Sequence, residues 1–347
     1  MGKLIIKYID ADGGFMMKIQ LNASEIANLW TTYMNNLMYI FSIPYYMKKC
    51  EDEEICSIIE LTLEISQEIV VNIEEILKQE NFPLPLGFTE EDVDLNAPRL
   101  YSDQFALIQY NALAENGLEF YGLSLVNSTR LDVRDFFTHC VSLTTKLYNQ
   151  SKDLLVKRGL ANSAPTIPIP EKADFVHQQG FLTGWFGDRR PLNAIEINQL
   201  VFNIRGVALA GAKLMSYSQI AKSKDLRDFF IRGKEMCDKH IEVFTSLLRE
   251  DDLPSLTTYE SEVTNSTIPP FSDKMMMFFI MTIGAVFISK YGSAIGLCNR
   301  RDIGLHFTRL LAETAKYLED TANIMIKNGW MEQPPQATAR KALGENR

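Results

Sequence analysis

The sequence lacks the features that usually reveal an enzyme or a nucleic-acid-binding protein. Its 347 residues include only four histidines, and no glycine-rich phosphate loop, G-x-S-x-G elbow or zinc-ligand spacing is present. The net charge of -9 leaves no basic excess for binding phosphate backbones. We therefore expect no nucleic-acid partner, no bound cofactor and no catalytic residues of a common motif class.

The sequence also has no apolar run of the ~20 residues that a membrane-spanning helix needs. The most apolar segment, Met275 to Ser289, is bounded by Lys274 and Lys290. Met1 to Gly14 contains no sustained apolar stretch of the kind that marks a signal peptide. We therefore expect a buried core helix near residues 275–289, with no membrane span.

The cysteines are too irregularly placed to suggest a disulfide scaffold or a zinc site. There are five, Cys50, Cys56, Cys140, Cys237 and Cys298, and no C-x-x-C pair occurs among them. An odd number without ligand spacing is typical of free thiols in a reducing compartment. We therefore expect five free cysteines, no disulfide or metal site at Cys50 and Cys56, and a cytoplasmic location.

An internal repeat is the strongest signal in the sequence. The segment Leu21–Ile26 recurs as Leu192–Ile197, at an offset of 171 residues. After one deletion the offset is 170, so that Tyr121-Gly122 recurs as Tyr291-Gly292 and Phe137-Thr138 recurs as Phe307-Thr308. Matches that keep their order along the whole unit predict two copies of one structure.

Each copy is predicted to contain four helices, because apolar residues recur at intervals of three and four. Asn22 and Ser102 are suitable N-caps in the first copy, and Asn193 and Ser272 occupy the equivalent places in the second. Pro44 lies late in the first helix, where proline is expected to kink or end it.

The lengths of the connections predict how these helices are arranged. Short turns join the first helix to the second and the third to the fourth, whereas about twenty residues (81–100 and 251–271) separate the second from the third. Two hairpins with one long crossover are typical of a ferritin-like bundle. We therefore predict an all-α chain with a tandem repeat of two ferritin-like four-helix bundles, at 1–163 and 172–347, joined by a proline-rich linker at 164–171.

Three segments of the second copy also resemble a known family. They are Phe181–Ala194, Pro270–Met277 and Asn328–Pro335. They resemble signatures of the domain of unknown function 3231, a family from endospore-forming bacteria. The resemblance implies one or two ferritin-like bundles and, because some members carry a provisional spore coat label, an association with spores. It supplies no catalytic residues.

A ferritin-like fold raises the possibility of a di-iron centre. Such a centre takes a Glu from each of two helices and a Glu-x-x-His from each of the other two. None of the four histidines has a Glu three residues before it. Glu25 and Glu196, on the first helix of each copy, lie at the helix start. We therefore expect no di-iron site and no other metal.

Three titratable residues occupy core positions of the second copy that are apolar in the first. His240, His306 and Glu313 stand where the first copy has Ile69, Phe136 and Leu143. The favoured interpretation is a buried hydrogen-bonded pair of His240 with Glu313. The alternative is a ligand or metal site. A carboxylate this close should raise the pKa of His240.

Two functions follow as hypotheses. The first is a non-enzymatic structural or interaction protein, cytoplasmic or associated with the spore, whose apolar helix near Met275–Ser289 contacts the neighbouring bundle, a second copy of the chain or a protein partner. The second is a bundle that binds a small molecule or metal through His240, His306 and Glu313. In both cases the specific role is expected in the second copy.

Overall fold

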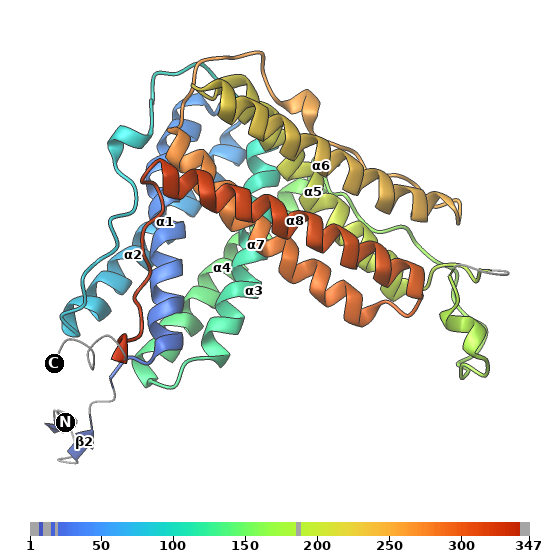
Figure 1. Cartoon of the computed structure of the whole chain (residues 1–347), viewed down its shortest axis with the longest axis horizontal. Coiled ribbons are helices and arrows are strands. Elements are labelled where there is room, and N and C mark those ends of the chain that lie inside the picture. The colour runs from blue at the N-terminus through green and yellow to red at the C-terminus, as the bar shows by residue number, and fades with distance from the viewer. Residues whose placement is uncertain (1–6, 10–14, 18–19, 185–188, 341–347) are drawn as a thin grey trace.

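A computed structural model describes residues 7–9, 15–17, 20–184 and 189–340. Within these residues, eight long helices form two four-helix bundles (Figure 1). The helices of the first bundle are α1 (Ala23–Lys49), α2 (Glu53–Gln79), α3 (Asp103–Val126) and α4 (Leu131–Lys157). Those of the second are α5 (Ala194–Ile220), α6 (Lys224–Arg249), α7 (Asp273–Leu297) and α8 (Arg301–Lys327). The predicted tandem repeat of helical bundles is confirmed.

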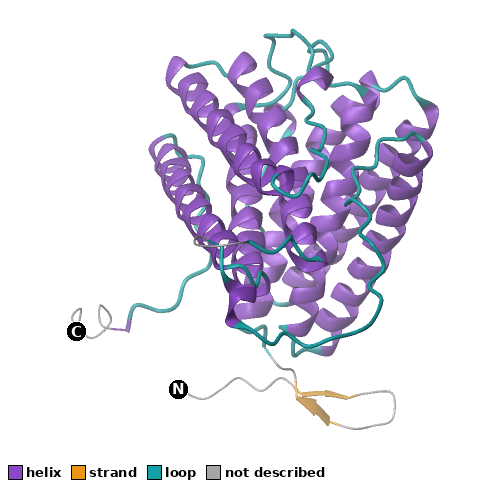
Figure 2. Cartoon of the chain, turned by 90° about the vertical axis from the view of Figure 1, so that its right-hand side faces the viewer, coloured by secondary structure: helices purple, strands orange, loops and turns teal. Residues whose placement is uncertain are grey.

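Three short 3-10 helices lie in the connections, and one small hairpin was not predicted. The 3-10 helices are η1 (Glu90–Asp92), η2 (Gln179–Leu182) and η3 (Glu260–Glu262). Strands β1 (Lys7–Ile9) and β2 (Phe15–Met17) pair antiparallel, with Lys7 opposite Met17. In Figure 2 this hairpin lies outside the helical body. Two predicted features lie outside the described residues. Of Met1–Gly14, where no signal peptide is expected, the structure describes only residues 7–9, and it does not describe residues 185–188 of the family-like segment.

Local capping explains why the two copies start their helices at equivalent places. Asn22 and Asn193 each accept backbone hydrogen bonds at the start of α1 and α5, and Glu25 and Glu196 complete a capping box with them. Both glutamates are fully buried and also accept from the backbone N–H at the start of the bundle's last helix: Glu25 from Arg130 at 2.8 Å and Glu196 from Arg300 at 2.9 Å. These carboxylates thus hold each bundle together at one end.

Pro44 does not end α1, which continues to Lys49. The last turn is held by tertiary contacts of the next residue. The Tyr45 hydroxyl donates to the Pro98 carbonyl at 2.7 Å and accepts from the Leu100 N–H at 2.9 Å. These contacts compensate for the backbone hydrogen bond that a proline inside a helix removes.

The long crossovers run from residue 80 to 102 and from residue 250 to 272, and they bind each other. The Asp94 N–H donates to the Pro270 carbonyl at 2.9 Å, and the Thr264 N–H donates to the Leu100 carbonyl at 2.9 Å. At the repeat offset of 170 these two bonds are equivalent, with the roles of the copies exchanged. The same is true of Ser272 N–H to Asp92 (2.8 Å) and Ser102 N–H to Glu262 (3.0 Å). The two bundles therefore meet about a pseudo-twofold axis, as the subunits of a symmetric dimer do.

A lysine is buried where the bundles meet. Lys213 of α5 is 1% exposed, and its ammonium nitrogen donates to the Tyr46 hydroxyl at 2.7 Å. The same atom lies 4.0 Å from the ring centroid of Tyr101. Burial lowers the pKa of Lys213 well below its usual value. The hydrogen bond between the bundles is therefore made by a lysine side chain that loses its proton more readily than a lysine in water does.

The apolar helix predicted near 275–289 is α7, and it faces the first bundle. The Phe278 ring contacts the Phe88 ring with centroids 5.1 Å apart, and Thr282 Oγ1 lies 3.3 Å from Asn35 Oδ1. Among the described helices, α7 alone is long and apolar enough to cross a bilayer by length and composition. Here its apolar surface is used between the bundles. A further contact of α7 with a second copy of the chain or with a protein partner stays a prediction.

The predicted domain limits around the linker at 164–171 also stay a prediction.

Candidate functional site

His240 lies deep in the second bundle, with a hydrogen-bond partner among the described residues on one ring nitrogen only. His240 is 1% exposed, and its Nδ1 lies 2.9 Å from the Tyr291 hydroxyl. Its Nε2 is 3.6 Å from Glu313 Oε2, beyond hydrogen-bonding distance, and has no hydrogen-bond partner. Glu313 is instead held by Lys239, whose ammonium nitrogen is 2.8 Å from both carboxylate oxygens. His240 and Glu313 are thus neighbours, while the strong pair is Glu313 with Lys239.

The expectation that the pKa of His240 lies above its ordinary value is wrong. Burial dominates and lowers the pKa of His240 to about 4, although the charge of Glu313 acts in the opposite direction. The carboxylate is one-third exposed and already paired with Lys239, so its effect is reduced. The sequence could not show this because the pKa depends on how deeply the imidazole is buried.

His306 does not join this pair. It is half-buried on α8, and no hydrogen bond or ion pair among the described residues links it to His240 or Glu313. Burial, assisted by the charge of Arg309, lowers the pKa of His306. Across the part of the chain that the structure describes, no group of three or more His, Cys, Asp or Glu side chains is arranged to hold a metal ion. The three predicted residues therefore supply one buried histidine with a neighbouring carboxylate.

A cavity suited to a ligand lies where the first bundle meets α7. Its volume is about 510 Å³, and it is lined by residues of α1, α2, α3 and α4, by residues of α7 and by Leu209 of α5. Its walls are mainly apolar. They include Trp30, Met34, Ile65, Ile69, Leu113, Phe120, Phe278 and Ile283. A cavity of this size is within the range of small-molecule sites in proteins.

Two aromatic residues fill the equivalent space in the second bundle. The Phe287 ring lies against the backbone of Gly206, where an added Cβ would be 3.1 Å from it. The Tyr317 hydroxyl lies against Gly233, where an added Cβ would be only 2.2 Å away. Each large residue is thus matched by a glycine on the facing helix.

The first bundle has neither pair. At the positions of Phe287 and Gly206 it has Gly117 and Asn35, and at those of Tyr317 and Gly233 it has Leu147 and Thr62. All four of these residues line the cavity. In addition, α5 packs more extensively against α7 than α1 does against α3. The cavity thus results from smaller side chains at two positions and a wider gap between two helices.

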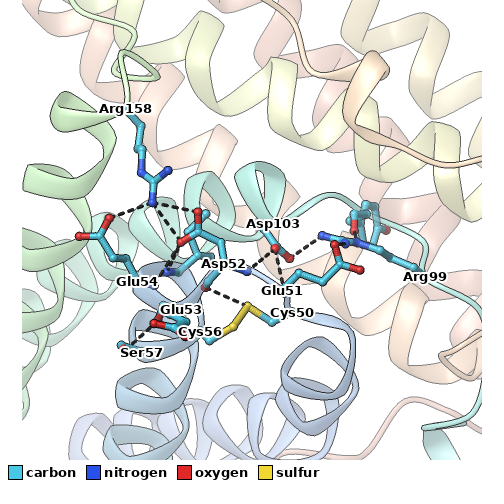
Figure 3. Close-up of a disulfide and its surroundings, with 12 residues drawn as sticks. Cys50, Glu51, Asp52, Glu53, Glu54, Cys56, Ser57, Arg99, Asp103 and Arg158 are labelled. Atoms are coloured by element: carbon cyan, nitrogen blue, oxygen red, sulfur yellow. Dashed lines mark hydrogen bonds and ion pairs between the residues drawn. A yellow bond between two sulfur atoms is a disulfide. The ribbon is translucent and has the colours of Figure 1, made fainter.

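The first copy also contains a disulfide that the sequence did not predict. Cys50 and Cys56 are bonded, with Cα atoms 5.8 Å apart, across the turn between α1 and α2 (Figure 3). The expectation of five free cysteines is therefore wrong for this pair, while Cys140, Cys237 and Cys298 are free. Cys50 is the C-cap of α1 and Cys56 lies in the first turn of α2, so the short connection brings the two sulfur atoms together without any C-x-x-C spacing. A disulfide also fits a reducing cytosol poorly.

Charged side chains surround this turn. Arg158 reaches from the end of α4 to Glu54 at 2.8 Å and Asp52 at 2.9 Å, as Figure 3 shows. Asp103, at the start of α3, accepts the backbone N–H groups of Glu51 at 3.0 Å and Asp52 at 2.9 Å. The turn is therefore fixed to both α3 and α4, and neither cysteine of the disulfide lines the cavity.

Comparison with known proteins identifies both copies. The profile described as "Protein of unknown function (DUF3231)" matches residues 10–173 and 180–343. No curated protein matches the chain. A crystal structure from Bacillus halodurans, described as a "putative spore coat protein", is 19% identical, covers 45% of this chain and 98% of its own, and aligns with a TM-score of 0.37. A TM-score this low carries no argument about function.

Proposed function

The chain belongs to the DUF3231 family, and we propose that it is a non-enzymatic binding protein that holds an apolar small molecule in the cavity of its first bundle. The observation that carries this proposal is the mainly apolar cavity of about 510 Å³ between the helices of the first bundle and α7. The proposed site thus belongs to the first copy, whereas His240, His306 and Glu313 suggested a site in the second.

Close packing makes such a volume hard to explain as a packing defect. Protein interiors are packed as densely as organic crystals, with few voids larger than a water molecule. Unfilled apolar volume destabilises a protein by roughly 24 cal/mol per Å³ when side chains are deleted. The second bundle, built on the same helices, avoids this cost with Phe287 and Tyr317. A ligand that fills the space in the first bundle would remove the same cost.

The direct test fills the cavity with the residue pairs of the second copy. The paired substitution Asn35→Gly with Gly117→Phe reproduces the Gly206–Phe287 contact, and Thr62→Gly with Leu147→Tyr reproduces the Gly233–Tyr317 contact. Binding of the fluorescent hydrocarbon diphenylhexatriene to the whole chain is measured by titration. We expect saturable binding of one molecule by the natural sequence and a loss of at least about tenfold in affinity in each double variant.

A matched control uses a glycine of the same helix. Gly122 of α3 has no atom within 4 Å of an added Cβ, so Gly122→Phe adds the same ring outside the cavity and should leave binding unchanged. Circular dichroism checks that every variant is folded. Hydrocarbon binding that persists unchanged in both double variants would place the site elsewhere and contradict the proposal.

A location in the sporulating cell or the spore is a further proposal, and its support is the resemblance of residues 181–194, 270–277 and 328–335 to a family from endospore-forming bacteria. Fractionation of cells that carry a tagged chain would test it. Recovery of the protein in purified spores is the expected result. A protein confined to the cytoplasm of vegetative cells and absent from spores would contradict it.

A further inference from the structure

Part of the cavity lining consists of buried polar side chains. Several of them carry hydroxyl or amide groups, among them Thr32 and Asn36 of α1, Thr62 and Ser66 of α2, Tyr121 of α3 and Thr144 of α4. The walls toward α7 are mostly apolar. The site therefore combines an uncharged polar end with an apolar body.

One of these groups has no partner. Thr32 is 1% exposed, and its Oγ1 makes no hydrogen bond. A buried hydroxyl without a partner is uncommon, because its desolvation is not compensated. On the neighbouring turn, the Asn36 amide nitrogen donates to the Thr32 carbonyl at 2.8 Å and to the Tyr121 hydroxyl at 3.0 Å. Since the Tyr121 oxygen is an acceptor in this bond, its own proton remains available to an oxygen atom of a ligand.

The equivalent tyrosine of the second copy shows what such a hydroxyl does when it has a partner. The Tyr291 hydroxyl bonds to His240 Nδ1 at 2.9 Å. In the first copy the position of His240 is occupied by Ile69, which lines the cavity and offers no polar atom. Tyr121 therefore has no polar neighbour equivalent to the imidazole of the second bundle.

The charges around the cavity decide which ligands fit. None of the described lining residues is Lys, Arg or His, and Glu119 is the only carboxylate. Burial raises the pKa of Glu119, and Lys290 partly opposes this. Lys290 is already engaged by Asn116 at 2.9 Å and by Glu115 and Glu119 at 3.6 Å. Lys213, which lies 5.6 Å from the ring centroid of the lining residue Phe279, donates to the Tyr46 hydroxyl. A buried anionic head would therefore find no countercharge among the described lining residues.

We infer that the ligand is an uncharged amphiphile, with an alcohol or carbonyl oxygen against Thr32, Asn36 and Tyr121 and an alkyl or isoprenoid body that extends between α1 and α3 toward α7. This inference rests on the proposed function and specifies its ligand class. The Thr32 and Tyr121 hydroxyls donate to the ligand oxygen. A carboxylate or ammonium of the same chain length loses its hydration there without an ionic partner.

The experiment compares three competitors of equal chain length: decanol, decanoate and decylamine. The measurement is the displacement of diphenylhexatriene from the whole chain by each compound, near neutral pH, where decanoate and decylamine are charged. We expect decanol to compete at concentrations at least about tenfold lower than either charged compound. Equal competition by decanoate or decylamine would overturn the inference, although the cavity would remain a hydrocarbon site.

The variant Thr32→Val tests the polar end directly, because valine keeps the shape of threonine and removes the hydroxyl. The affinity of the variant for diphenylhexatriene is measured first, and decanol should then compete about fivefold to tenfold less well, relative to that affinity, than it does with the natural sequence. The control is Thr314→Val in the second bundle, where the hydroxyl donates to the Leu310 carbonyl of its own helix at 2.9 Å.

The two proposals fail in different ways. If the natural sequence does not bind diphenylhexatriene, the proposed function is wrong and competition cannot be measured. If diphenylhexatriene binds, but decanol displaces it equally well from the natural sequence and from Thr32→Val, the cavity holds a ligand whose oxygen does not contact Thr32. That second result would overturn only the ligand class.

Discussion

The two bundles have the same helices but different interiors. Their eight helices begin at equivalent positions of the repeat, yet the first encloses a cavity with a cluster of hydroxyl and amide groups, and the second is filled by Phe287, Tyr317 and the buried His240. Capping and periodicity thus specify the bundle, whereas the sizes of a few side chains decide whether it contains a cavity. The same scaffold can therefore carry a site in one copy and none in the other.

The turns between the first two helices differ in a similar way. In the first copy Cys50 and Cys56 form a disulfide. The equivalent residues of the second copy are Ala221 and Arg227, and the Arg227 guanidinium donates to the Ala221 carbonyl at 3.0 Å. A covalent bond and a hydrogen bond thus connect the same two places in the two hairpins.

The largest expected effect concerns His240. The unfolded chain protonates this histidine below about pH 6.5, whereas burial holds the folded pKa at about 4. Because the unfolded state then binds more protons, the free energy of unfolding falls as the pH decreases through this range, by up to about 3 kcal/mol. His240→Gln can still bond to Tyr291 but does not titrate, so this variant should lose much less stability on acidification.

Urea denaturation between neutral and acidic pH measures the difference. His306→Gln is the comparison variant, and its effect should be smaller because His306 is half-buried. If the natural sequence and His240→Gln lose stability in parallel between pH 6.5 and 4, the burial of the imidazole does not control acid sensitivity.

An intermediate effect is expected at the two hairpin turns. Replacing Cys50 and Cys56 with serine opens a short loop and should lower the free energy of unfolding by about 2 kcal/mol. Arg227→Ala removes hydrogen bonds of 3.0 Å to the carbonyls of Ala221 and Lys222 and should cost about 1 kcal/mol. Urea denaturation ranks the two. A reductant should reproduce the first change and leave Arg227→Ala unaffected. An equal loss in both variants would show that the disulfide adds nothing beyond the hydrogen bonds.

The smallest effect has the opposite sign. In the absence of ligand, Thr32→Val should raise the free energy of unfolding by about 1 kcal/mol, because it removes a buried hydroxyl that has no partner. Thermal or urea denaturation of delipidated protein measures this gain. Thr314→Val removes a bonded hydroxyl and should not stabilise the chain. A loss of stability in Thr32→Val would mean that its hydroxyl has a partner in solution.

Much of the fold was predictable from the residues because its causes are local. The N-caps Asn22, Asn193, Ser102 and Ser272 were predicted and are the N-caps of α1, α5, α3 and α7. Pro44 shows the limit of this reasoning, because the tertiary contacts of Tyr45 hold the helix past it. The site was not predictable in the same way. Exchanges such as Gly117 for Phe287 are visible in the repeat, but they indicate a cavity only once the facing glycines are known.

The sequence by itself determined the repeat, the helix boundaries and the long crossovers, because these depend on periodicity and capping within short segments. Only the tertiary structure decided the pseudo-twofold contact of the crossovers, the disulfide at Cys50 and Cys56, the low pKa of His240 and the cavity between α1 and α3. The crossover contact, the pKa and the cavity depend on distances between residues far apart in the chain or on how completely surrounding side chains fill space. The disulfide depends on the geometry of the turn between α1 and α2. Burial and volume are sums over several helices, and no single segment contains them.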